Sequence, residues 1–141
     1  MDRRPAIVLW PTQPPPAMPT LFEFHDSEVR RIAAQDGALQ ILFAAAFVRV
    51  GTASSGYAQS LEMQFLDARW DGILADCIGR LSDGRLLAGA SAQSSIPLPY
   101  ASAGPVQVEL QFSNGARLQI RAASLLCRFT GDPQFVESFA C

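Results

Sequence analysis

The sequence predicts an all-β protein, a single-domain antiparallel β-sandwich or flattened barrel. Three Asx-Gly pairs lie between apolar segments, at Asp36–Gly37, Asp83–Gly84 and Asn114–Gly115. This dipeptide is the strongest short-range signal for a β-hairpin. Apolar and polar residues also alternate with the period of two that strands show, and no helical pattern is longer than two turns. Strands this frequent favour a sandwich or a flattened barrel.

The composition indicates one domain that follows an N-terminal arm. The chain has 141 residues, of which 49% are hydrophobic and 17% charged, enough to bury a core. Six of the ten prolines fall in the first 19 residues, and such a segment favours extended polyproline geometry. We therefore expect an arm over residues 1–20 and a β-sandwich domain over residues 21–141.

The first hairpin is predicted at Asp36–Gly37. A two-residue loop there pairs Ala34 with Leu39 and Ile32 with Ile41, so that apolar residues face each other. The alternative is a short helix over residues 27–34, because Val29, Ile32 and Ala33 have helical spacing.

The middle of the chain is expected to hold several strands. Residues 41–48 are apolar on both faces, which is typical of a central strand covered on each side. Residues 51–56 read as a loop, and residues 57–69 as one long strand that holds a bulge. Pro97 and Pro99 cannot donate ladder hydrogen bonds, so their segment is predicted to be an edge or a crossover between sheets.

The last hairpin, at Asn114–Gly115, allows its register to be derived. A two-residue loop would place Phe112 opposite Arg117 and every apolar residue opposite a polar one. A three-residue loop of residues 113–115 instead pairs Phe112 with Ala116 and Leu110 with Leu118. It also puts Gly115 at the left-handed position that such a loop requires.

Charge, cysteine content and hydropathy exclude several classes of partner. The net charge is −2, and the basic residues are all arginines spread along the chain, which argues against nucleic-acid binding. No apolar run approaches the length of a membrane-spanning helix, and the apolar piece at residues 6–10 is too short for an export signal. The three cysteines, Cys77, Cys127 and Cys141, show no disulfide or zinc spacing. We therefore expect a cytoplasmic protein without cofactor.

Five short stretches, taken in order, resemble a family of small uncharacterised bacterial proteins. They are FHDS at 24–27, DGRL at 83–86, IPLP at 96–99, FSNGARLQI at 112–120 and GDPQFVESF at 131–139. The resemblance covers roughly residues 21–140, and the chain departs from it at Gly56–Tyr57, where the family has Gly-Trp. It implies a compact β domain, carries no agreed activity and supplies no catalytic residue.

His25, Asp26 and Ser27 are the only grouping that suggests a hydrolase. A catalytic triad normally assembles from residues distant in sequence, and no G-x-S-x-G elbow is present. Neighbours on a strand point to opposite faces, so we expect His25 and Asp26 to diverge. The favoured interpretation is that Asp26 or Ser27 bonds nearby backbone at a turn.

Two other residue groups were weighed as sites. Asp67, Asp71 and Asp76 could serve a glycosidase or bind calcium, but their spacing fits solvated turns better than an EF-hand. Six aromatic residues could line a ligand cavity, although core packing is the expected role: Phe43, Phe47, Phe65, Trp70, Phe112 and Phe129.

Three functions remain open. The first is a non-enzymatic interaction or self-association module, motivated by low charge and by an open sheet edge near Pro97. The second is a small-molecule-binding barrel, and the third a small hydrolase that uses His25. For the first function we expect a homodimer in which the arm lies across the neighbour with Trp10 as an apolar anchor.

Overall fold

The computed structural model describes residues 20–51, 54–130 and 136–137, and this part of the chain is all-β as predicted. The predicted arm, Trp10 and Cys141 lie outside the described residues. The elements in chain order are β1 (Thr20–Gln35), β2 (Ala38–Val50), β3 (Ser54–Ala58), β4 (Leu61–Leu66), β5 (Arg69–Asp71), the 3₁₀ turn η2 (Leu74–Asp76), β6 (Gly79–Ala88), β7 (Ser91–Gln93), β8 (Ser95–Leu98), β9 (Tyr100–Ser102), β10 (Val106–Phe112), β11 (Arg117–Ala122), β12 (Ser124–Phe129) and β13 (Val136–Glu137).

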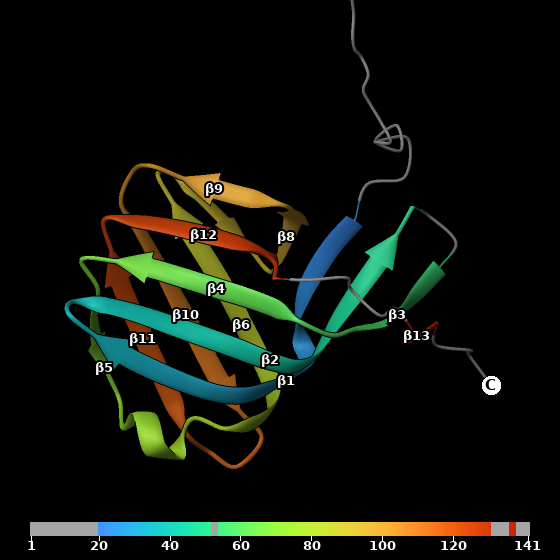
Figure 1. Cartoon of the computed structure of the whole chain (residues 1–141), viewed down its shortest axis with the longest axis horizontal. Coiled ribbons are helices and arrows are strands. Elements are labelled where there is room, and N and C mark those ends of the chain that lie inside the picture. The colour runs from blue at the N-terminus through green and yellow to red at the C-terminus, as the bar shows by residue number, and fades with distance from the viewer. Residues whose placement is uncertain (1–19, 52–53, 131–135, 138–141) are drawn as a thin grey trace, which may run out of the picture.

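The strands form one antiparallel sheet that folds over itself into a flattened sandwich. The strand order is β5-β11-β10-β6-β1-β2-β4-β12-β9, with β3, β7, β8 and β13 attached off this path. One layer contains β1, β2, β4, β12 and β9, and the strands of the other layer, β6, β10 and β11, cross behind it (Figure 1). The end strands β5 and β9 do not pair with each other, so the sheet is not closed into a barrel.

Strand β1 bends sharply because it carries a large bulge. Glu23 pairs with Phe47 of β2 and Glu28 pairs with Ala45, so four residues of β1 lie opposite one residue of β2. On the other side of β1, the part before the bulge pairs with β8, whereas Glu28 and Val29 pair with β6. The bulge is thus the corner at which one strand joins both layers.

The core between the layers is filled with apolar side chains. The largest fully buried ones are Phe22, Phe24, Phe65, Phe112, Leu39, Ile41, Leu61, Met63, Leu81, Leu86, Ile96 and Leu118. The rings of Phe22 and Phe24 meet edge to face, with centroids 5.1 Å apart. Phe43, Phe65 and Phe112 are buried, and Trp70 and Phe129 pack against them at the rim, so these five aromatic residues serve the core.

Two of the three predicted hairpins are confirmed. At Asp36–Gly37 both residues have positive φ, 52° and 79°, which is the geometry of a type I′ turn. At Asn114–Gly115 the Phe112 amide donates to the Ala116 carbonyl at 2.8 Å, and Gly115 has a φ of 94°. The derived pairing of Leu110 with Leu118 is observed.

The third predicted hairpin, at Asp83–Gly84, is wrong. Both residues lie inside β6, which pairs along its length with β10. A Cβ atom on Gly84 would lie 2.7 Å from the Cβ atom of Phe24. The glycine therefore lets β6 approach a core phenylalanine and does not serve a turn.

The short helix over residues 27–34 is also wrong, since these residues belong to β1. The single long strand over residues 57–69 is divided into parts of β3, β4 and β5. The breaks come where Ser60 and Asp67 have positive φ values of 68° and 50°. The loop over residues 51–56 is shorter than expected, because β3 begins at Ser54.

Residues 41–48 form a central strand as expected, with β1 on one side and β3 and β4 on the other. They are covered on one face only: Ile41 and Phe43 are buried, whereas Ala44 is exposed. Of the two alternatives predicted around Pro97 and Pro99, the edge is the one observed, because among the described strands β8 pairs only with β1 and β9 pairs only with β12. Among the described residues there is no helix that is both long and apolar enough to cross a membrane.

Candidate functional site

Ser27 is a structural residue of the β1 bulge. It is fully buried, and its hydroxyl donates a hydrogen bond to the Glu23 carbonyl at 2.7 Å. The same oxygen accepts a hydrogen bond from the Phe47 amide at 2.8 Å. Both contacts satisfy backbone groups that the bulge removes from the β1–β2 ladder. The interpretation of Ser27 as a side chain that bonds nearby backbone is confirmed.

His25 and Asp26 do not diverge, which corrects the expectation from strand geometry. Asp26 has a φ of 69°, and this left-handed conformation brings its carboxylate to 3.6 Å from His25 Nδ1. His25 Nε2 lies 3.1 Å from Glu23 Oε1, and Glu23 also pairs with Arg49. The His25 side chain is 48% exposed, and its ring lies 5.8 Å from that of Phe47. These residues form a charged surface cluster from which the buried Ser27 hydroxyl is separate.

The described cysteines are buried free thiols. Burial raises the pKa of the Cys127 thiol to about 12. Burial also raises the pKa of Cys77, with a further contribution from the neighbouring Asp76 carboxylate, and the Cys77 thiol donates to the Ile73 carbonyl at 3.3 Å. A thiol held in its neutral form is a poor nucleophile, so burial disfavours a nucleophilic role for both residues.

Glu62 is the other buried polar side chain of the described region, at 4% exposure. Its Oε2 atom accepts hydrogen bonds from the side-chain amides of Gln40 and Gln64, the second at 3.1 Å. Gln40 and Gln64 are cross-strand partners on β2 and β4, and Glu62 follows on the same face of β4. The two glutamine amides therefore stabilise the buried Glu62 carboxylate by hydrogen bonds on one face of the sheet.

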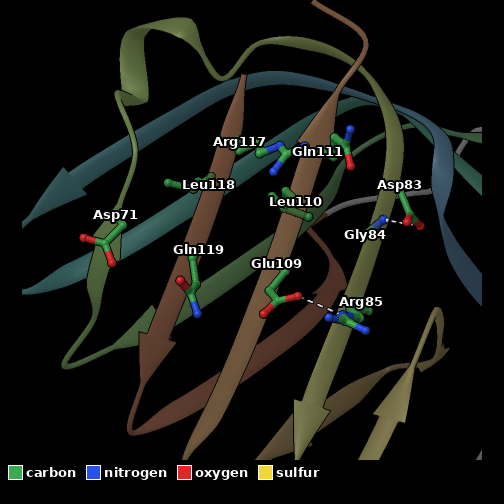
Figure 2. A pocket seen from close by; sticks show the side chains of 10 residues that line it. All are labelled: Asp71, Asp83, Gly84, Arg85, Glu109, Leu110, Gln111, Arg117, Leu118 and Gln119. Atoms are coloured by element: carbon green, nitrogen blue, oxygen red, sulfur yellow. Dashed lines mark hydrogen bonds and ion pairs between the residues drawn. The ribbon is translucent and has the colours of Figure 1, made fainter. Parts of the chain in front are cut away.

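The structure offers a polar hollow on the outer face of the β5–β11–β10–β6 layer (Figure 2). Its volume is about 590 Å³. It is lined by Asp71, Asp83, Gly84, Arg85, Glu109, Leu110, Gln111, Arg117, Leu118 and Gln119. We call these residues the polar hollow.

The side chains of the polar hollow stand in two rows across the strands. Cross-strand pairing aligns Asp71, Gln119, Glu109 and Arg85 in the first row. Two residues further along the strands, the second row contains Arg117, Gln111 and Asp83. Figure 2 shows the first row extending from Asp71 on β5 to Arg85 on β6. Because side chains on a strand alternate between its faces, this row is a direct result of the antiparallel register.

The centre of the polar hollow is ordered by hydrogen bonds. Arg85 Nε donates to Glu109 Oε1 at 2.8 Å, and the Gln107 amide donates to Glu109 Oε2 at 2.9 Å. Asp83 Oδ1 accepts the Gly84 amide at 2.8 Å. The hollow therefore presents fixed carboxylate, guanidinium and amide groups, and it suits the recognition of a polar surface or ligand.

The polar hollow contains no serine, cysteine, histidine or lysine, and its candidate acid, base or nucleophile groups are the carboxylates of Asp71, Asp83 and Glu109. Of the three aspartates weighed above, only Asp71 lies in it, whereas Asp67 is at a turn and Asp76 is in η2. Within residues 20–51, 54–130 and 136–137, no group of three acidic, histidine or cysteine side chains could hold a metal ion.

The sequence contains part of the signal for the polar hollow. Glutamine, glutamate and arginine alternate with apolar residues on β10 and β11, which predicts one polar face. The contributions of Asp71 and Arg85 were missed, because they depend on the pairing of β5 with β11 and of β6 with β10.

Comparison of the chain with known protein families, with curated proteins and with solved structures finds no match. The resemblance to a bacterial family of small β domains stays a prediction.

Proposed function

We propose that the protein is a non-enzymatic interaction module that associates with a second copy of itself through the polar hollow. The observation that carries this proposal is the first row of side chains, which has a carboxylate at one end, Asp71, and a guanidinium at the other, Arg85. With strands about 4.8 Å apart, the two ends are separated by about 14 Å. A face whose two ends carry opposite charges is suited to bind a copy of itself in the reversed direction.

A two-fold axis parallel to the strands, between β10 and β11, gives a complementary arrangement. It lays Asp71 over the partner subunit's Arg85 and Gln119 over the partner subunit's Glu109. In the second row it lays Arg117 over the partner subunit's Gln111. A third cross-strand pair, Arg121 and Gln107, lies on the other side of the first row. The same axis lays Arg121 over the partner subunit's Gln107. None of these contacts opposes like charges.

The short outer strands support association through a face and not through an edge. The edge strands β5, β7 and β9 have three residues each, and the edge strand β8, which contains Pro97, has four. Short edge strands are a common protection against strand addition from another chain. The open edge that first suggested self-association is thus a weak template, and the polar hollow is the stronger surface.

A small polar ligand is the second candidate, because the volume of the hollow lies in the range of ligand pockets. Against it, ligand pockets are mostly apolar and enclosed, and the polar hollow is open and mostly polar in its side chains. A closed barrel with an internal cavity is not compatible with the filled core. We propose the cytoplasm as the compartment, because Cys77 and Cys127 are free thiols and a reducing environment maintains them.

Charge reversal tests the self-association. We expect the wild-type chain to show concentration-dependent dimers in sedimentation velocity at tens of micromolar. Arg85→Asp or Asp71→Arg alone should weaken dimerisation at least about tenfold, since each opposes like charges twice in a two-fold dimer. The double variant should recover the wild-type dimer, because it reverses both ends of the row.

The matched control is Arg128→Asp, a charge reversal at an exposed residue of β12 in the other layer, which should leave dimerisation unchanged. In the double variant, aspartate at position 85 cannot form the Arg85–Glu109 pair within one chain. A recovery of dimerisation in this variant therefore reports the contact between the two copies. The proposal is contradicted if the wild-type chain stays monomeric at these concentrations. It is also contradicted if the double variant dimerises as weakly as the two single variants. Saturable binding of a small polar molecule to the monomer would favour the second candidate.

A further inference from the structure

A second hollow, of about 510 Å³, lies where β2 passes the turn between β3 and β4. It is lined by Arg30, Leu42, Phe43, Ala44, Gln59, Ser60, Leu61 and Thr130. We call it the arginine pocket. Its residues come from β1, β2, the β3–β4 turn and the end of β12, so it forms only when distant segments pack together.

Arg30 enters the arginine pocket because of a second irregularity in β1. Val29 pairs with Phe43 and Arg31 pairs with Leu42, which are consecutive residues of β2. Arg30 is therefore an extra residue with no cross-strand partner on β2. A bulge of this kind redirects a side chain, and Arg30, an exposed residue, is among those that line the pocket.

The opposite wall of the arginine pocket is the β3–β4 turn, which is held in one position. Ser60 has a φ of 68°, an uncommon conformation for serine. Its carbonyl accepts two hydrogen bonds from Thr130, from the amide at 2.8 Å and from the hydroxyl at 3.2 Å. These bonds tie the turn that carries Gln59 and Ser60 to the end of β12.

The lining has one sign of charge. Arg30 is the single ionisable side chain among the eight lining residues, and Gln59 and Ser60 add neutral hydrogen-bond donors. The polar hollow differs, because it mixes three carboxylates with two guanidinium groups. Leu42 and Ala44 supply apolar surface beside these donors, whereas Phe43 and Leu61 are buried beneath it. A guanidinium and amide donors next to apolar surface match a carboxylate that is attached to an apolar body.

We propose that the arginine pocket binds an apolar carboxylate, with the carboxylate on Arg30 and its apolar body on Leu42 and Ala44. Gln59 and Ser60 donate further hydrogen bonds to the carboxylate oxygens. The proposal does not depend on self-association, because none of the eight lining residues belongs to the polar hollow.

The test measures binding of hexanoate by heteronuclear NMR titration of the full chain. We expect saturable shifts at Ser60 and Arg30, with hexanol, which lacks the charge, and inorganic phosphate, which lacks the apolar body, each binding at least about tenfold more weakly. Arg30→Gln should weaken hexanoate binding at least about tenfold. Arg31→Gln is the matched control, since Arg31 is the next residue, is exposed and does not line the pocket, and it should change binding less than twofold.

A Ser60→Gly variant separates binding from folding. Glycine accepts the positive φ and removes the hydroxymethyl side chain while the Ser60 carbonyl position keeps its bonds to Thr130, so the turn should persist while hexanoate binds more weakly. Failure of hexanoate to saturate at millimolar concentration overturns the proposal. So does equal binding of hexanol, which would make the pocket an apolar cleft only, or an equal loss in Arg30→Gln and Arg31→Gln.

Discussion

The dipeptide Asp-Gly occurs in two places in this sandwich where the surroundings differ. Gly37 is at the tip of the β1–β2 hairpin, where a Cβ atom would meet nothing within 4 Å and where φ is 79°. Gly84 is in the middle of β6 and is buried against Phe24, whose Cβ, Cγ and Cδ1 atoms would all lie within 2.9 Å of an added Cβ. One glycine is required for its backbone conformation and the other for the space that it leaves.

The aspartates differ in the same way. Asp36 takes part in the turn with a φ of 52°, whereas Asp83 stays extended and its carboxylate accepts the amide hydrogen of Gly84. A tip residue is free to adjust toward solvent, but a strand residue pressed against a core ring is not. The same substitution should therefore be far more damaging at residue 84 than at residue 37.

The largest expected effect is that of Gly84→Ala. The added methyl group would overlap Phe24, which is fully buried and edge to face with Phe22, so either β6 or the ring must move. We expect a loss of about 3 kcal/mol in the free energy of unfolding, at the upper end for an overpacked core. Urea denaturation measures it. Gly104→Ala is the control, because that position has open space and no positive φ, and a similar loss there would contradict the explanation.

The second prediction tests whether Phe24 is the cause. A double-mutant cycle of Gly84→Ala with Phe24→Ala should show a coupling free energy of about 2 kcal/mol, since alanine at position 24 removes the Cγ and Cδ1 atoms that the new methyl group would meet and leaves only Cβ. If the two losses simply add in urea denaturation, the damage at residue 84 comes from β6 itself and not from its contact with Phe24.

A smaller effect is expected for Gly37→Ala. The alanine meets no atom, but it must adopt the left-handed conformation, which costs about 1 kcal/mol. Thermal denaturation should therefore show a modest decrease in Tm. A loss as large as that of Gly84→Ala would remove the distinction between conformation and space.

The smallest effect is expected at the aspartates. Asp36→Asn should raise stability by less than about 0.5 kcal/mol, because asparagine tolerates positive φ in a type I′ turn. Asp83→Asn should be close to neutral, since the amide oxygen also accepts the Gly84 amide hydrogen. A clear loss at Asp83 in chemical denaturation would show that its negative charge matters for the row that it shares with Arg117.

These positions show which parts of the fold were readable from the sequence. The hairpins at Asp36–Gly37 and Asn114–Gly115 depend on turn chemistry and on matching apolar faces, and both are local properties. The role of Gly84 depends on Phe24, 60 residues away in the sequence, so the same dipeptide predicted a turn that does not exist. The break at Ser60 was equally hidden, because a serine with positive φ leaves no compositional signal.

The candidate sites also combine features that the local sequence predicts with features that depend on distant strands. The alternation on β10 and β11 predicts a polar face, but its charged ends come from β5 and β6 through pairings that no local pattern reveals. At His25 and Asp26, the rule that strand neighbours diverge failed because the bulge gives Asp26 a left-handed conformation. Five of the six aromatic residues were correctly assigned to the core, since large apolar side chains are usually buried wherever the strands pair. The exception is Phe47, which is half-buried and lies against His25 and Tyr57.

The central position of β1 has a consequence for synthesis on the ribosome. The first described strand has β6 on one side and β2 on the other, and the layer that covers its core face is completed only by β10 and β11. Translation adds about 5–20 residues per second, so Phe22 and Phe24 emerge several seconds before Leu118 and Cys127 exist to pack with them. During that interval the nascent hairpin exposes an apolar face beside unpaired strand edges. Holding chaperones, slow codons or a high local concentration of sister chains will therefore act on this protein before it has folded, and more strongly than on a fold whose first strand lies at the edge of its sheet.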